Sequence, residues 1–221
     1  MGGTTTAEPA PEINTITWPV PPPNGYTVDD LLTLPDLPPH TELIDGGLVF
    51  ASPQRLLHAD VIDMLLSGLR AAAPRDRVRV RREMTVVLNR RNGPEPGVLA
   101  VRAESVRGPG QTAYQAADVL LAVEVVSPDS EERDRDTKPR KYAAVGVPHF
   151  WLVERAGESP HPVVRVYELD PVARGYTPRG IFRGRLTLDE PFDIDIDIDL
   201  AAVDELQYAA PGAVGRQVAK P

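Results

Sequence analysis

The stretch from Asp118 to Glu154 constrains the fold of this chain more than any other. It reads DVLLAVEVVSPDSEERDRDTKPRKYAAVGVPHFWLVE. Val119–Val126 is almost wholly apolar and β-branched, which is typical of a strand covered on both faces. A charged connection follows, then a short helix expected from about residues 136–138 to Gly146, and a second apolar strand at Phe150–Val153. This order of strand, helix and strand predicts an α/β domain.

One acidic residue, Glu124, interrupts the first of these strands. A carboxylate inside such a strand is costly to bury unless another group pairs with it. In one interpretation Glu124 lies at the exposed end of the strand or meets an arginine. In the other it is a metal-binding or catalytic carboxylate at the edge of a cleft. Lys138 is expected at the entrance of the following helix, close to where that strand ends, which favours the second interpretation.

The composition is that of a globular protein, with 42% hydrophobic and 25% charged residues in 221. The absence of cysteine excludes disulfides and cysteine-ligated metals. No apolar run approaches the roughly 18 residues of a membrane span. The N-terminus has neither the basic start nor the apolar core of a secretory signal, so we expect a cytoplasmic protein with no membrane partner.

The chain divides into a Pro-rich flexible tail at residues 1–24, one folded domain at 25–208 and a flexible C-terminal tail at 209–221. The formal net charge is −8, which argues against broad, nonspecific binding of nucleic acid but allows a local basic groove. Hydrophobic spacing and turn residues predict the remaining elements. They are a helix at 26–34, a hairpin at 41–51, a helix at 56–73, strands at 77–87 and 98–101, a loop with little core at 102–117, an antiparallel hairpin of 163–169 with 184–188, and a half-buried edge strand at 192–200.

Basic residues are concentrated at residues 75–82 and 133–141. Arg79 and Arg81 alternate with apolar residues, and Arg135 belongs to the second group. A solvated strand face and a phosphate-contacting patch both fit this pattern. We therefore treat Arg79, Arg81 and Arg135 as candidate contacts to nucleic acid. His58 lies near the start of a helix. A lone histidine there is more often a cap or surface residue than a ligand, and we interpret it in this way.

Glu42 at a strand start, Glu124 at the end of a buried strand and Lys138 shortly afterwards form a candidate catalytic set. Metal-dependent hydrolysis of a phosphodiester needs such residue types. Carboxylates hold a hard divalent cation, which activates water and neutralises developing charge. A lysine can stabilise the charged transition state or orient the water. The spacing alone makes this a weak signal.

The local sequence around these residues strengthens the prediction of a phosphodiesterase site. From residue 26 to about 206 the chain resembles the Uma-type restriction endonuclease family of the PD-(D/E)XK nuclease superfamily. The matching residues are Tyr26-Thr27-Val28-Asp29-Asp30 with Leu34-Pro35, Glu42-Leu43-Ile44-Asp45-Gly46, His58, Glu124-Val125-Val126-Ser127-Pro128, Asp134, Lys138, Tyr142-Ala143, Gly146-Val147 and Phe150-Trp151-Leu152-Val153.

The resemblance implies a restriction endonuclease-like fold. This is a mixed β-sheet core flanked by helices, with an N-terminal hairpin and additional C-terminal antiparallel strands. It also implies a DNA endonuclease that uses Mg²⁺ or Mn²⁺. Glu124 matches the acidic residue of the superfamily motif, Lys138 matches its lysine, and Glu42 matches an acid that supports the metal. A homodimer is also expected by analogy with nucleases that cut both strands, although no interface is visible in the sequence.

One departure concerns the second metal ligand. The family carries an Asp where this chain has Gly97, so one carboxylate is missing. Glu95, two residues earlier, is the candidate replacement, although Pro96 lies between them. Loss of a carboxylate from a hard-cation site weakens metal binding severely. The alternative to an active or impaired nuclease is therefore an inactive nuclease-fold protein that binds nucleic acid or a protein partner.

Overall fold

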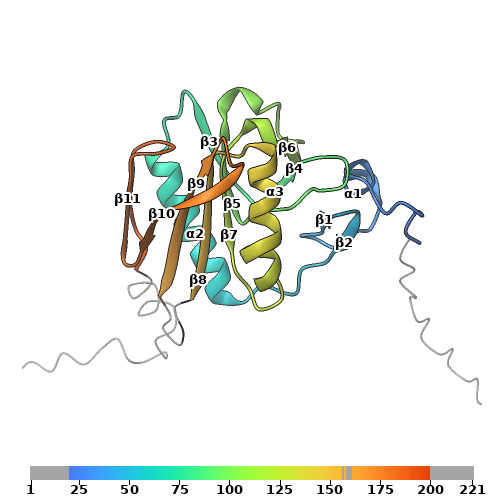
Figure 1. Ribbon diagram of the computed structural model, residues 1–221, viewed down its shortest axis with the longest axis horizontal. Helices are drawn as coiled ribbons and strands as arrows, with labels where there is room; N and C mark the ends of the chain where they lie inside the picture. Colours follow the sequence, from blue (N-terminus) through green and yellow to red (C-terminus); the bar gives the residue numbers. More distant parts are fainter. Residues whose placement is uncertain (1–19, 156, 158–160, 200–221) are drawn as a thin grey trace, which may run out of the picture.

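The computed structural model describes residues 20–155, 157 and 161–199. Most of the predicted N-terminal tail and the whole of the predicted C-terminal tail lie outside these residues. The described chain is built around one six-stranded mixed sheet with a helix on each face (Figure 1). No helix in this part of the chain is long and apolar enough to cross a membrane.

The central sheet has the strand order β10-β9-β8-β7-β5-β3. Only β7 and β8 are parallel, and the other neighbours are antiparallel. The strands span β3 Val78–Arg82, β5 Val98–Arg102, β7 Val119–Val125, β8 His149–Arg155, β9 Pro162–Asp170 and β10 Gly175–Phe182. The predicted apolar strands at 119–126 and 150–153 are therefore confirmed, and they lie side by side at the centre.

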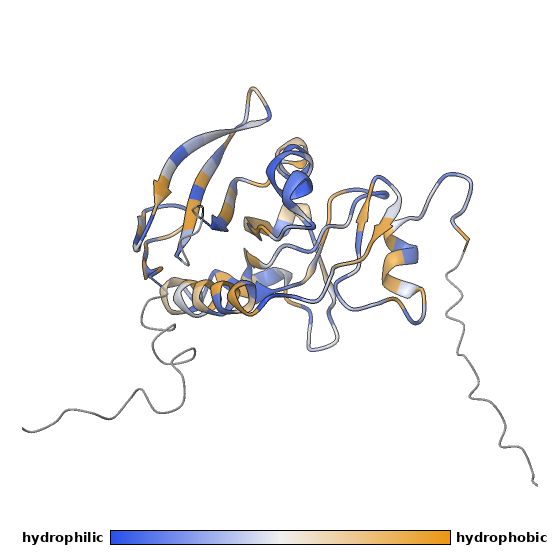
Figure 2. Cartoon of the chain, turned by 90° about the horizontal axis from the view of Figure 1, so that it is seen from below, coloured by the Kyte–Doolittle hydropathy of each residue, from blue (hydrophilic) through white to orange (hydrophobic). Residues whose placement is uncertain are grey.

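The helices α2 (Leu56–Ala72) and α3 (Lys138–Val145) cover opposite faces of this sheet. Figure 2 shows the strands between them, with apolar residues along the inner surfaces. Alternate residues of β7 serve the two layers: Val123 packs with α2, and Ala122 packs with Tyr142 of α3. Because both faces are covered, β7 is apolar almost throughout, and Glu124 is its one charged residue.

The predicted N-terminal helix and hairpin are also confirmed. Helix α1 (Val28–Thr33) begins with a capping box between Thr27 and Asp30. The hairpin joins β1 (Glu42–Ile44) to β2 (Gly47–Val49). Its turn residues Asp45 and Gly46 have φ of 51° and 83°, the left-handed geometry that favours an Asp-Gly pair. This places Glu42 on a strand beside the main sheet.

The prediction of one strand over residues 77–87 is wrong. Glu83 has φ of 47° and turns the chain, so β3 ends at Arg82 and β4 (Thr85–Val87) starts a separate pairing. β4 pairs in parallel with β6 (Ala113–Gln115). Residues 102–117 therefore are not a loop with little core: the short helices η1 (Ala103–Ser105) and η2 (Ala116–Asp118) flank β6, whose Tyr114 is buried.

The predicted pairing of 163–169 with 184–188 is also wrong. β9 pairs with β8 and β10, while β11 (Arg185–Leu188) pairs with β12 (Ile194–Asp197). The alternating isoleucines and aspartates predicted the faces of β12 correctly, since Ile196 is buried and Asp195 is exposed. Ile196 packs so closely on α2 that a Cβ added at Gly68 would lie 2.6 Å from its Cγ2.

The helical segment before β8 begins earlier than predicted. A π-helical stretch, η3 (Arg133–Thr137), leads directly into α3. Pro139 has no N–H to donate and lies in the first turn of α3, as the sequence indicated. The wider η3 turn brings Asp134 and Lys138 to the same side of the segment, where their side chains form an ion pair. Helix α3 ends at Gly146, whose φ is 89°.

Candidate active site

A buried ammonium group lies at the centre of the candidate site. Lys138 Nζ lies 2.8 Å from Glu42 Oε1 and 3.0 Å from Glu124 Oε2. It also lies 2.9 Å from Asp134 Oδ1. The Lys138 and Glu124 side chains are only 4% exposed. The structure therefore brings together the predicted catalytic residues Glu42, Glu124 and Lys138, and it adds Asp134.

Each of these groups comes from a different part of the fold. Glu124 is the penultimate residue of the central strand β7, and Glu42 begins the hairpin strand β1. Asp134 and Lys138 are one turn apart on the helical segment that follows β7. Tyr142, a further turn along α3, donates its hydroxyl to Glu124 Oε1 at 2.8 Å. Both oxygens of Glu124 are thus bonded, which offsets the cost of burying it.

Burial and charge act on these groups in opposite directions. Burial raises the pKa of Glu124 to about 8, against the opposing attraction of Lys138. Burial also disfavours the charge of Lys138, but the surrounding carboxylates outweigh it and hold the Lys138 pKa well above its ordinary value. Lys138 is therefore expected to be charged at neutral pH, with the Glu124 oxygens accepting hydrogen bonds from Lys138 and from Tyr142.

The predicted replacement ligand, Glu95, belongs to a neighbouring group. Its Oε1 lies 2.6 Å from His40 Nδ1, and burial raises the pKa of its carboxyl. His40 Nδ1 is also 3.9 Å from Glu83 Oε1. This group around His40 meets the Lys138 cluster at Glu42, whose Oε1 accepts the backbone N–H of Glu95 at 2.7 Å. Glu95 and Glu124, the two predicted metal ligands, thus bind different partners.

Gly97 lies beside Val125, the last residue of β7. A Cβ built at Gly97 would lie 3.2 Å from Ile62 Cδ1 and 3.5 Å from Val125 Cγ2. Ile62 is a fully buried residue of α2. The first bond of a new side chain would therefore press on the apolar layer under α2, and an Asp at this position needs that layer to move.

The donor set does not fit the Mg²⁺ or Mn²⁺ site that the nuclease family implies. Within the described residues, no group of three or more His, Asp or Glu side chains could hold a metal ion. The carboxylates of Glu42, Glu124 and Asp134 converge on Lys138, whose ammonium occupies the place of a cation. Gly97 adds no oxygen, and Glu95 is engaged by His40.

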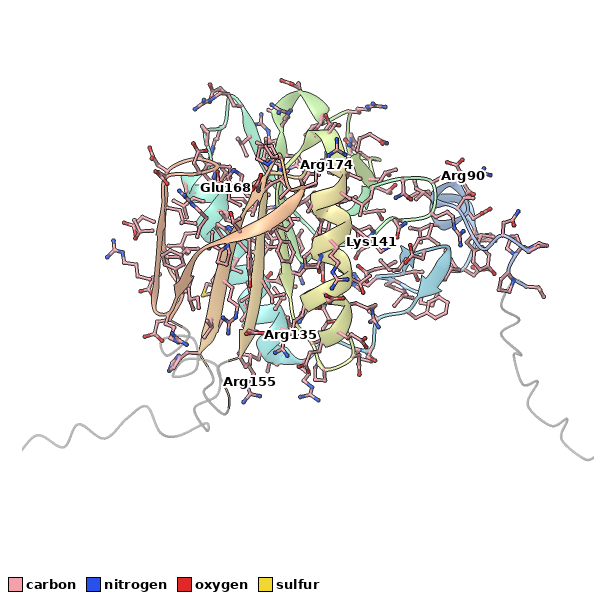
Figure 3. The ribbon with its side chains drawn as sticks, viewed as in Figure 1. Arg90, Arg135, Lys141, Arg155, Glu168 and Arg174 are labelled. Carbon is pink, nitrogen blue, oxygen red and sulfur yellow. The ribbon has the colours of Figure 1, made fainter. Side chains whose placement is uncertain are left out.

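The cluster opens into a pocket of about 390 Å³ at the edge of the sheet where β7 and β8 end and α2 begins. Its charged lining includes Glu42, Glu95, Glu124, Asp134 and Lys138. Arginines also line it, namely Arg55, Arg133, Arg135 and Arg155. Arg135 and Arg155 lie at this edge in Figure 3. The pocket thus combines acidic groups with surrounding guanidinium groups.

The predicted nucleic-acid contacts fall in two places. Arg135 lines the pocket and forms ion pairs with Glu131 and Glu154. Arg79 and Arg81 lie on β3 and are not part of the pocket lining: Arg79 bonds to backbone carbonyls, and Arg81 donates to the Tyr114 hydroxyl.

Three other residues that line the pocket were harder to identify as site residues from the sequence. His58 does line the pocket, although the sequence favoured a cap or surface role for it. Asp134 has a sequence signal, its spacing of four residues from Lys138 on a helix. Arg133, within a dense run of charges, has none.

The fold is shared with a solved structure described as a putative nuclease belonging to DUF820 from Anabaena variabilis ATCC 29413. The match has a TM-score of 0.58 and 16% sequence identity, and it covers 75% of this chain and 89% of that one. At this identity the likeness shows a common nuclease-like fold alone. The chain itself belongs to the Uma2 family, described as "Putative restriction endonuclease", whose model matches residues 28–201. No curated protein matches the chain. The family and fold expected from the sequence are confirmed.

Proposed function

We propose that this Uma2 family member binds DNA at the Lys138 pocket and does not cleave it by metal-dependent hydrolysis. One observation carries the proposal: a single ammonium group lies 2.8–3.0 Å from three acidic side chains, while Gly97 stands where a further carboxylate is expected. A divalent cation entering this site would have to displace a lysine whose pKa is raised by those same carboxylates.

DNA binding is supported by the arginines around the pocket. Guanidinium groups bind phosphate oxygens in bidentate geometry. Arg133 and Arg155 line the opening together with Arg135, so a phosphate backbone can follow this edge of the sheet. Because the formal net charge of the chain is −8, we expect DNA to bind only at this local group of arginines. We expect weak affinity and a shallow dependence on salt, because the slope of log affinity against log salt scales with the number of phosphates contacted, and few are contacted here.

The second candidate is the metal-dependent endonuclease that the family description suggests. The observation that favours it is the convergence of Glu42, Glu124 and Lys138 in one pocket. In that function Mg²⁺ or Mn²⁺ would supply the Lewis acid and the activated water. A homodimer would place two such sites on the two strands of a duplex.

Fluorescence anisotropy with labelled DNA tests the binding part of the proposal. We expect binding that weakens as salt rises, and we expect Arg133→Ala to reduce the slope of log affinity against log salt by about 1. Arg79→Ala, on a strand outside the pocket lining, and Arg90→Ala, at the far end of the molecule in Figure 3, are matched controls. Loss of binding in the Arg79→Ala protein with full binding by Arg133→Ala would place the DNA elsewhere.

A further inference from the structure

We infer that the pocket receives one unstacked nucleotide of a single strand, whose base carries an exocyclic amino group, with that base inside and its phosphate at the rim. This inference rests on the proposed DNA binding and names its substrate class. A volume of about 390 Å³ is of the size that holds a small organic ligand. A base within an intact duplex is stacked and paired, and it must leave the stack to enter such a pocket.

Part of the pocket lining is apolar. Phe50 contributes from the segment that joins β2 to α2, and Leu57 from the first turn of α2. Val126 and Pro128 contribute from the end of β7, and Val153 from β8. Phe50 is 43% exposed even though it is a large aromatic residue. Aromatic and aliphatic side chains of this kind are the surfaces on which single-stranded nucleic acids place their bases.

The floor of the pocket is acidic, and this orients the ligand. Glu42, Glu83 and Glu95 all line it, and Glu95 is mostly buried. These carboxylates repel a phosphate, so the phosphate is expected at the rim beside the arginines. Oε1 of Glu95 pairs with His40, and its second oxygen can accept a hydrogen bond from an amino group, as carboxylates do from the N4 amino group of cytosine. The floor therefore favours cytosine over thymine, which presents a carbonyl oxygen at the same ring position.

Two buried nitrogen atoms in the lining support a ligand independently. Within the described residues, Arg133 Nε and His58 Nδ1 are shielded from solvent and have no hydrogen-bond partner. Both residues line this pocket. Burial lowers the pKa of His58, so its imidazole is neutral and can either donate or accept. Buried polar groups without partners are rare in native proteins, so these two nitrogen atoms are candidates to bind a ligand in the pocket.

The test compares the affinity of the full chain for short labelled oligo-dC, oligo-dT and a duplex of the same length, measured by anisotropy at one low salt concentration. We expect oligo-dC to bind about tenfold more tightly than oligo-dT, and more tightly than the duplex. Phe50→Ala should weaken oligo-dC binding about tenfold and leave duplex binding unchanged. Leu56→Ala is the matched control, because Leu56 is 60% exposed beside the pocket and does not line it.

The possible outcomes separate this inference from the proposed function. Equal binding of oligo-dC and oligo-dT, or equal affinities of the Phe50→Ala and Leu56→Ala proteins, overturns the inference. Oligo-dC binding that depends on Arg133 but not on Phe50 also overturns it and leaves the proposed function standing. No binding to any of the DNAs overturns both. Because Phe50 and Leu56 are exposed, both variants are expected to fold, and unfolding curves verify this.

Discussion

The Glu42 carboxylate accepts the backbone N–H of Glu95 through Oε1 at 2.7 Å. The same oxygen lies 2.8 Å from Lys138 Nζ. One oxygen atom thus ties the N-terminal hairpin to the segment before β5 and to the start of α3. Glu42 therefore holds the site together as well as contributing charge to it, and this dual role can be separated by substitution.

Glu42→Ala should lower the free energy of unfolding by about 2 kcal/mol, because it leaves a buried N–H without an acceptor and removes one partner of Lys138. Glu42→Gln keeps a carbonyl oxygen in place and should cost less than half as much. Denaturant titration of both proteins measures the difference. Equal losses in the two variants would mean that the charge of Glu42 matters and its hydrogen bond to Glu95 does not.

The stability of the protein should depend on pH through Glu124. Its pKa is raised from 4.5 to about 8 on folding, so the folded state binds a proton that the unfolded state releases. The stabilising contribution is complete below pH 4.5 and is lost as pH rises through about 8. The slope from this group is at most about 1.4 kcal/mol per pH unit in that window.

The Glu124→Gln variant isolates this effect, because glutamine resembles the protonated acid and does not titrate. We expect the two proteins to have similar stability near pH 5, and the variant to become the more stable as pH approaches 8. Denaturant unfolding across this pH range measures the difference. A constant difference at every pH would show that Glu124 keeps the same protonation state in the folded and unfolded chains.

Gly68 is required by the close packing of β12 on α2. A methyl group there would lie 2.6 Å from Ile196 Cγ2 and 2.8 Å from its Cγ1. Gly68→Ala should therefore destabilise the protein by about 1–2 kcal/mol, despite the better helix propensity of alanine. Gly110→Ala, with no atom within 4 Å of the new methyl group, should change stability by less than about 0.5 kcal/mol. Thermal or denaturant unfolding measures the stability of the two variants. Equal stabilities would mean that the contact between Gly68 and Ile196 is loose enough to accept a methyl group.

Gly97→Asp should destabilise the protein by about 2 kcal/mol, because its Cβ meets the buried Ile62 and its carboxylate enters an apolar layer. Adding Ile62→Val removes Cδ1, the nearest atom, and should recover part of this loss. The two proteins are compared by denaturant unfolding without added metal. A Gly97→Asp protein as stable as the parent would mean that α2 yields easily and that a single substitution can supply a new carboxylate.

Hydrophobic patterns in the sequence predicted the elements in which one face or both faces are buried. The isoleucines and aspartates of β12 and the apolar strands β7 and β8 are examples, because burial of one or both faces fixes their pattern. The break at Glu83 was missed because a left-handed φ in a glutamate leaves no compositional signal. The pairing partners of β9 and β11 were missed because strand pairing depends on contacts between distant segments.

In the site, too, local patterns could be predicted and contacts between distant segments could not. Glu42, Glu124 and Lys138 could be predicted because each has a recognisable local context that matches the family. The engagement of Glu95 by His40 could not be predicted, since the two residues are far apart in sequence and His40 takes a left-handed φ of 59°. Arg55, Arg155 and the pair of Arg133 and Arg135 come from three separate parts of the chain, so no single spacing in the sequence connects them.

Cleavage of supercoiled plasmid in Mg²⁺ and in Mn²⁺ tests the central claim most directly, with the natural protein beside its Glu124→Gln variant. If Lys138 and Gly97 leave no place for a catalytic cation, both proteins will leave the plasmid supercoiled to the same extent as buffer alone. Metal-dependent nicking by the natural protein that is absent from the Glu124→Gln protein would contradict the account, and it would establish an active nuclease at this site.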